Sequence, residues 1–151
     1  MTRATFEDFK SQTYAFEVET PDGDSLEFEM RAPTPAELLE IDISHPRPQP
    51  RVFDFHAPAK KGGEPRPRYS SDDDAPPDVK EEWTRAINVW FREHRNRQIL
   101  AALTMDIPGE TVEDKIAAME SLGAWAVSAF SKALTEVIST SEGALKQRPF
   151  R

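Results

Sequence analysis

The sequence lacks several features on which whole classes of protein depend. It contains no cysteine, which excludes disulfides, thiol nucleophiles and thiolate metal sites. No apolar stretch approaches the roughly 20 residues needed to cross a bilayer, and the first residues, MTRATFEDFK, lack the apolar run of a signal peptide. We therefore expect a soluble protein of the cytoplasm.

Signatures of catalysis, of cofactor binding and of metal binding are also missing. The histidines, His45, His56 and His94, are far apart and none has a metal-ligand spacing. The glycines of KKGG lack the flanks of a phosphate-binding loop, no serine stands in a nucleophile elbow, and DDD lacks the spaced ligands of a calcium loop. The sequence predicts no enzyme, no cofactor and no metal site.

Positive charge is in deficit. The 151 residues include 27 Asp and Glu against 19 Lys and Arg, for a formal net charge of −8. Nucleic acid and anionic membranes both require a positive face, so we expect neither as a partner. A chain of this length is one domain of ordinary size, or a small domain with an arm.

Residues 1–44 predict a β-hairpin and a short helix. Apolar and polar residues alternate in TYAFEVET and in SLEFEMRA, and TPDGDS between them favours a turn. One face of the hairpin is then apolar, and the other carries Glu17, Glu19, Glu27 and Glu29. That acidic face is either solvated or covered by a basic segment. Thr34, Pro35 and Glu37 form a capping-box start for a helix that ends near Ser44.

Residues 45–77 predict an arm or insertion without long regular elements, because prolines recur along it. Its basic residues are followed by an acidic run, which is typical of a flexible loop or of a segment that orders on a partner. VFDFH can add as a strand to a sheet edge, and PRPQPR is a weak match to a proline-rich ligand. We predict that a partner orders the arm, with Phe53 and Phe55 as anchors.

Residues 78–139 predict a helical bundle, and residues 140–151 a polar tail. Helical spacing runs through PDVKEEWTRAINVWFREHRNRQILAALTM, which is one helix with a charged band or two helices meeting near Asn96. Two helices follow, in TVEDKIAAMESLG, where Thr111 and Asp114 frame a capping-box-like start, and in AWAVSAFSKALTEVIST. The fold class is therefore α+β: a small N-terminal β-hairpin followed by a mainly α-helical bundle, with a long Pro-rich insertion.

Two sets of side chains in the long helical segment are candidates for partner binding. Its aromatic residues, together with Trp125 and Phe130, either line a groove for an amphipathic helix or form the core of the bundle. Its arginines either contact a partner or belong to an ordinary solvated helix face. The candidates are Trp83, Trp90, Phe91, Arg92, Arg95 and Arg97.

The order of the predicted elements resembles that of the tail assembly chaperones of long-tailed bacteriophages and prophages. One resembling part is the hairpin with MRAPTPAEL at the step from strand to helix. The other is ILAALTM, followed by a Pro-Gly turn, ETVEDKIAAM and a last apolar helix. The resemblance covers about two thirds of the chain, and the insertion at 45–77 departs from compact members of the family.

The resemblance implies a non-catalytic protein that binds the tape-measure protein, keeps this long helical chain soluble and recruits tail-tube subunits. It places the protein in the bacterial host cytoplasm, and we expect a homo-oligomer. One alternative is a structural virion subunit, such as a minor tail or head-tail connector protein. The other is a cellular adaptor whose proline-rich arm binds a peptide-reading domain.

Overall fold

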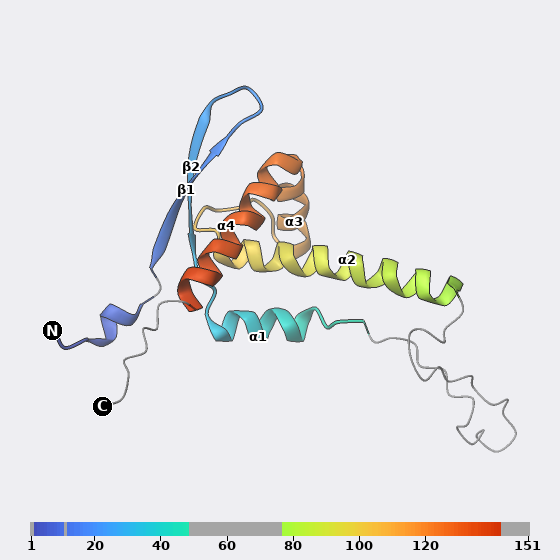
Figure 1. Ribbon diagram of the computed structural model, residues 1–151, viewed down its shortest axis with the longest axis horizontal. Helices are drawn as coiled ribbons and strands as arrows, with labels where there is room; N and C mark the ends of the chain where they lie inside the picture. Colours follow the sequence, from blue (N-terminus) through green and yellow to red (C-terminus); the bar gives the residue numbers. More distant parts are fainter. Residues whose placement is uncertain (1, 11, 49–76, 143–151) are drawn as a thin grey trace, which may run out of the picture. The chain divides into compact units, whose positions relative to one another are not determined.

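The computed structural model describes residues 2–10, 12–48 and 77–142 of the chain (Figure 1). The predicted anchors Phe53 and Phe55 lie outside these residues. The elements are η1 Phe6–Phe9, β1 Thr13–Glu19, β2 Ser25–Arg31, α1 Pro35–Ser44, α2 Pro77–Ala102, α3 Val112–Glu120 and α4 Ala124–Glu142. An antiparallel hairpin followed by helices confirms the predicted α+β class.

The chain divides into two compact units. The first consists of Met1–Ser44 and His94–Arg151, and the second of His45–Glu93. Helix α2 contributes to both, because the division falls inside it. The domain boundaries drawn from the sequence stay a prediction.

The hairpin follows the predicted alternation. Phe16 pairs with Phe28 and Tyr14 with Met30, so the aromatic and apolar residues share one face. Gly23 closes the turn at φ 88°, a left-handed conformation that glycine adopts without a steric penalty. Met30 is fully buried, whereas Leu26 stays 52% exposed because it lies next to the turn, at the far end of the strand.

The opposite face of the hairpin is acidic, as expected. Glu17 and Glu27 stand directly opposite each other, and both are exposed. The hydroxyl of Ser25 donates a hydrogen bond to Glu17. The basic stretch considered as a cover for this face falls mostly within residues 49–76, which the structure does not describe.

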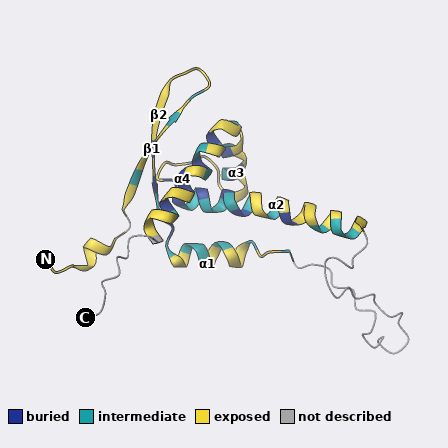
Figure 2. Cartoon of the chain, in the orientation of Figure 1, coloured by how far each residue is buried: buried dark blue, intermediate teal, exposed yellow. Residues whose placement is uncertain are grey.

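The core of the first unit lies where the hairpin meets α2, α3 and α4 (Figure 2). The ring of Phe28 meets that of Phe130 edge-on, with 5.1 Å between centroids. The largest fully buried side chains are Met30, Ile99, Met119, Leu134 and Val137. Each such side chain contributes about 1.5–3 kcal/mol relative to an exposed position, so this cluster holds the hairpin and the helices together.

Helix α2 runs unbroken through Asn96, which settles the choice between one helix and two. Two polar residues of its middle are buried, and both have partners: Asn96 Nδ2 donates to Glu120 Oε1 at 2.8 Å, and His94 Nε2 lies 3.0 Å from Asp42 Oδ1. The helix therefore continues through the charged band, because the two buried polar residues, His94 and Asn96, have polar partners on neighbouring elements.

The start of α3 is fixed by a short-range hydrogen bond, and a further short helix, η1, lies near the N-terminus. At α3, Thr111 Oγ1 accepts a hydrogen bond from the backbone N–H of Asp114 at 3.1 Å, as predicted. The short η1 was not predicted, because four residues are too few to show a period. It leaves Phe6 and Phe9 exposed by 81% and 78%.

Candidate functional site

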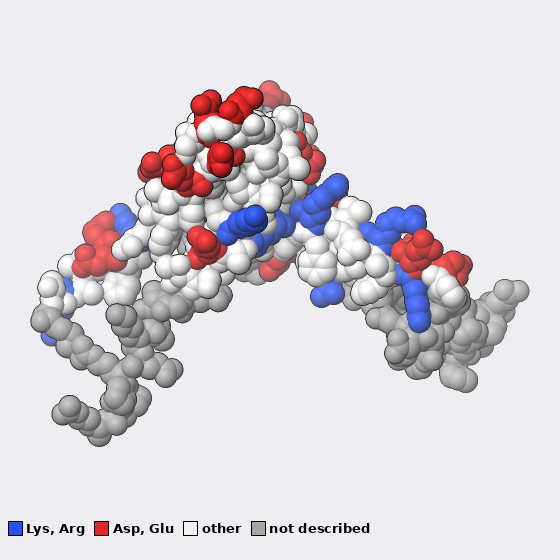
Figure 3. All heavy atoms as spheres, turned by 45° about the horizontal axis from the view of Figure 1, so that its top comes forward, with Lys and Arg blue, Asp and Glu red and all other residues white. Residues whose placement is uncertain are grey.

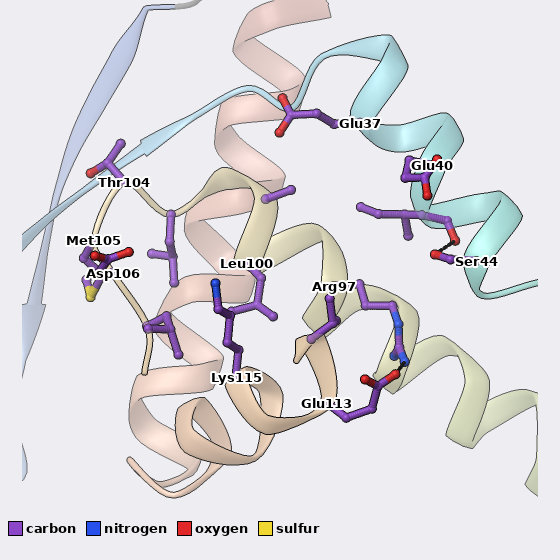
Figure 4. Close-up of a pocket in the computed structure, with 15 residues that line it drawn as sticks. Glu37, Glu40, Ser44, Arg97, Leu100, Thr104, Met105, Asp106, Glu113 and Lys115 are labelled. Atoms are coloured by element: carbon purple, nitrogen blue, oxygen red, sulfur yellow. Dashed lines mark hydrogen bonds and ion pairs between the residues drawn. The ribbon is translucent and has the colours of Figure 1, made fainter. Parts of the chain in front are cut away.

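A groove in the first unit is the candidate site. It has a volume of about 590 Å³ and lies between α1, the C-terminal part of α2, the segment 103–111 and the start of α3 (Figure 4). This volume falls within the range of about 300–1,000 Å³ typical of ligand-binding clefts. The apolar lining consists of Ile41, Leu100, Ala101, Leu103, Met105, Ile107 and Val112.

Helix α1 forms one wall of the groove, and none of its side chains is buried (Figure 2). Its apolar residues lie on two sides. Leu38 and Ile41 are half-buried, whereas Leu39 and Ile43 are 59% and 66% exposed. An isolated helix of ten residues is only marginally stable in water. Helix α1 therefore depends on specific contacts with the rest of the unit.

Polar contacts at its first turn supply part of that support. The backbone N–H of Thr34 donates to Glu37 Oε1 at 3.1 Å, and the N–H of Glu37 donates to Thr34 Oγ1 at 3.2 Å, which confirms the predicted capping box. The guanidinium of Arg31, at the end of β2, donates to both carboxylate oxygens of Glu37 at 2.6 Å. These bonds from Arg31 lower the pKa of Glu37 to about 2. Strand, cap and helix are thus joined through one carboxylate.

The opposite wall, residues 103–111, is attached to the hairpin. Leu103 forms a β-bridge with Met30, and the backbone N–H of Thr104 donates to Glu29 O at 3.2 Å. Gly109 has φ 144°, and a Cβ at this position would lie 2.8 Å from the backbone nitrogen of Lys115. Only glycine fits there without a shift of the backbone. Both walls are therefore positioned by the same strand, β2.

Two of the four acidic residues at the groove are already neutralised. Glu37 is paired with Arg31, and Arg97 Nη2 lies 3.4 Å from Glu113 Oε1. These pairs are internal to the walls and leave little net charge for a ligand.

Glu40 and Asp106 differ from these paired carboxylates. Both are exposed, and neither has an ion-pair partner among the residues that the structure describes. Glu40 projects from α1 and Asp106 from the opposite wall, so the two carboxylates flank the apolar lining (Figure 4). Lys115 on α3 is the one lining cation that lacks such a partner within the described residues. The groove combines an apolar floor, where the Lys115 ammonium lies beside Leu100, with a carboxylate on each side (Figure 4).

No protein-family model matches the chain, and no curated protein or solved structure is significantly similar to it. Within residues 2–10, 12–48 and 77–142, no helix is long and apolar enough to span a membrane. The same residues contain no group of three or more His, Asp or Glu side chains that could hold a metal ion.

The predicted candidates Trp90 and Phe91 meet in the second unit. The rings of His45 and Trp90 are parallel within 1°, with centroids 5.8 Å apart, and Trp90 Nε1 donates to His45 O at 3.2 Å. The guanidinium of Arg47 lies 5.6 Å from the ring centroid of Phe91, which is 53% exposed. This cluster includes two residues, His45 and Arg47, that were not among the sequence candidates.

The remaining aromatic candidates have different environments. Trp83 is half-buried, and its buried Nε1 has no hydrogen-bond partner in the described structure. Phe130 belongs to the core, and Trp125 is 36% exposed. Trp125 and Phe130 belong to the first unit, and Trp83, Trp90 and Phe91 belong to the second.

The three arginines of the cationic band also separate. Arg95 packs against α4, where its Nη2 donates to Ser131 O at 2.8 Å and also to the hydroxyl of Thr135. Burial lowers the pKa of Arg95 below its ordinary value. Arg97 pairs with Glu113, and Arg92 is exposed. Of the three, Arg92 offers the most accessible charge to a partner.

Sequence reasoning missed the groove and its two carboxylates, Glu40 and Asp106. Its walls come from distant parts of the chain, and isolated acidic residues in a polar sequence carry no signal. One clue was available in α1, where Leu38 and Ile41 define one side and Leu39 and Ile43 another. A helix with two apolar sides predicts contacts on more than one side.

Proposed function

We propose that this chain is a non-catalytic tail assembly chaperone of a long-tailed bacteriophage or prophage. It binds the tape-measure protein, keeps that long helical chain soluble and recruits tail-tube subunits along it. The groove between α1 and residues 103–111 carries the proposal. An apolar floor between polar walls is the form in which proteins bind one face of an amphipathic helix.

The position of the groove supports the same proposal. The stretch MRAPTPAEL contains the start of α1, and ILAALTM with the Pro-Gly turn forms the end of α2 and the opposite wall. The first turns of ETVEDKIAAM complete the lining. Both resembling parts of the chain therefore contribute to the groove, MRAPTPAEL through Glu37 alone.

The size of the groove fits reversible binding of a client helix. Burying a side chain such as Leu or Ile contributes about 1.5–3 kcal/mol, and association costs at least about 4 kcal/mol of this gain. One groove that takes a few apolar side chains therefore binds weakly. Several copies along one long helix bind more firmly through avidity, and each copy is still released singly. This is the behaviour required of a chaperone that tube subunits displace.

The proposal is tested by recovering the tagged full-length chain from cells that produce the phage and identifying bound proteins by mass spectrometry. We expect the tape-measure protein and the tail-tube protein, and we expect the chain to be absent from purified virions. Stoichiometric amounts of the chain in virions would instead establish a structural subunit. Recovery of cellular proteins alone would favour the adaptor.

A matched pair of variants ties the result to the groove. Val112 lines the groove and Leu122 does not, yet both are 48% exposed. Val112→Ser should reduce recovery of the tape-measure protein, while Leu122→Ser should leave it unchanged. Because both side chains are largely solvated, neither substitution should unfold the protein.

A further inference from the structure

We infer that the groove selects an amphipathic helix that carries Lys or Arg on both sides of its apolar stripe. This inference rests on the proposed function for the identity of the client protein, and it adds the chemistry by which the client helix is recognised. It concerns the first unit alone, since every lining residue belongs to that unit.

Glu40 and Asp106, the two lining carboxylates without an ion-pair partner among the described residues, provide the charge complementarity. A helix whose apolar stripe lies on Leu100 and Met105 has one flank towards α1 and Glu40, and the other towards the opposite wall and Asp106 (Figure 4). Cationic side chains on these flanks gain a partner, whereas carboxylates are repelled. Complementary charge at the rim of an interface mainly sets specificity and the rate of association.

Lys115 opposes this preference, but it is one cation against two carboxylates. The wider surface strengthens the acidic side, because the chain carries a net charge of −8. In Figure 3 a patch of acidic side chains gathers at the top of the view. A cationic helix is therefore attracted to the molecule from a distance as well as held at the groove.

The charges also argue against a second copy of this chain as the occupant. The exposed apolar residues of α1, Leu39 and Ile43, are accompanied on the same helix by Glu40 and Asp42. Placing this helix in the groove of another copy brings its carboxylates towards Glu40 and Asp106 of that groove. Like charges brought together in an interface disfavour the association.

The test uses the purified full-length chain and two fluorescent helical peptides with the same apolar stripe, one flanked by Lys and the other by Glu. In fluorescence anisotropy we expect the Lys-flanked peptide to bind about tenfold more tightly at low salt, with a smaller difference at high salt. Equal affinities would overturn the inference.

Variants locate the effect. Glu40→Gln with Asp106→Asn should weaken binding of the Lys-flanked peptide about three- to tenfold. Glu19→Gln with Glu136→Gln removes the same charge from exposed positions outside the groove and should change binding by less than about twofold. If both double variants lost the same affinity for the Lys-flanked peptide, the preference would come from net charge. The assignment of the preference to Glu40 and Asp106 would then be overturned. Val112→Ser should weaken the binding of both peptides.

Self-association is the remaining outcome to be distinguished. If the chain dimerises on gel filtration, and Val112→Ser abolishes the dimer, a second copy occupies the groove and the inference is overturned.

The inference and the proposed function can fail separately. Recovery of the tape-measure protein in a Val112-dependent manner, without a preference for the Lys-flanked peptide, would retain the chaperone and reject the cationic helix. A clear preference for the Lys-flanked peptide that depends on the groove, without recovery of tail proteins, would retain the cationic helix and reject the chaperone.

Discussion

At the residue scale, Glu37 links three parts of the site. It completes the capping box of α1 with Thr34 and accepts two hydrogen bonds from Arg31 of β2. A glutamine at this position still serves the capping box, because its side-chain oxygen accepts from the N–H of Thr34. It loses the charge that pairs with Arg31. The two roles can therefore be separated by one substitution.

Glu37→Gln should lower the free energy of unfolding by about 1 kcal/mol near neutral pH. The folded-state pKa of Glu37 is lowered to about 2, so its contribution is present above the ordinary pKa of about 4.3. That contribution is lost as the pH falls towards 2. Urea unfolding across this range should show the two proteins converging in acid. Glu40→Gln, which removes a carboxylate without an ion-pair partner in the described residues, is the control. If the free energies of unfolding of wild type and Glu37→Gln differed by the same amount at all pH values, the stabilising role of the Glu37 charge would be contradicted.

Met30 and Leu26 belong to the same strand face and should differ sharply in stability. Met30→Ala empties a fully buried position and should cost about 2–5 kcal/mol. Leu26→Ala changes a side chain that is 52% exposed and should cost no more than about 0.5 kcal/mol. The measurement is the urea midpoint of each variant, and similar losses would contradict the burial described for the hairpin.

Local chemistry at this scale was predictable from the sequence, and distant partners were not. Thr34 and Glu37 are three residues apart, so their reciprocal hydrogen bonds could be predicted from spacing. Arg95 and Ser131 are far apart in sequence, and nothing in either segment indicates that they meet. Arg95 was accordingly a candidate for an external partner, whereas its guanidinium is used within the fold.

At the element scale, α1 and α4 are held in different ways. Helix α4 buries a continuous side, Ala126, Phe130, Ala133, Leu134 and Val137. Helix α1 buries no side chain and is held by its cap, by Arg31 and by the contact between Asp42 and His94. Elements with few buried contacts open at lower free energy than the core. A wall that opens readily suits the proposed role of the groove, which is to admit and release a helix.

Native-state hydrogen exchange should show this difference. We expect the backbone amides of α1 to exchange through local openings, at a lower free energy than those around Leu134 of α4, which should require global unfolding. Addition of the Lys-flanked peptide should slow exchange in α1 and leave α4 unchanged. Equal protection of the two helices in the free protein would contradict the loose attachment of α1.

The elements themselves were largely predictable, because periods of two and of 3.6 residues are clear in the hairpin and the helices. The continuity of α2 was not. His94 and Asn96 interrupt the apolar pattern in the sequence, and only their partners Asp42 and Glu120 explain why the helix continues. Burial of a polar side chain depends on a partner that periodicity cannot supply.

At the scale of the whole molecule, the strand β2 organises the groove. Its last residue, Arg31, holds α1, and the two residues before it, Glu29 and Met30, hold the segment 103–111. The two stretches that resemble tail assembly chaperones could be recognised in the sequence. The groove between them could not be predicted, because it forms only where β2 brings them together in the fold. This juxtaposition is what supports the chaperone proposal.

The central claim is that this groove keeps a tape-measure protein soluble. The most direct measurement is co-expression of that protein, from the phage or prophage proposed to encode this chain, with wild type, with Met105→Ser and Val112→Ser combined, or with Leu122→Ser. We predict a soluble complex with wild type and with Leu122→Ser, and aggregated tape-measure protein with the groove variant. Tape-measure protein that is insoluble in every case, or equally soluble with the groove variant, would contradict the account.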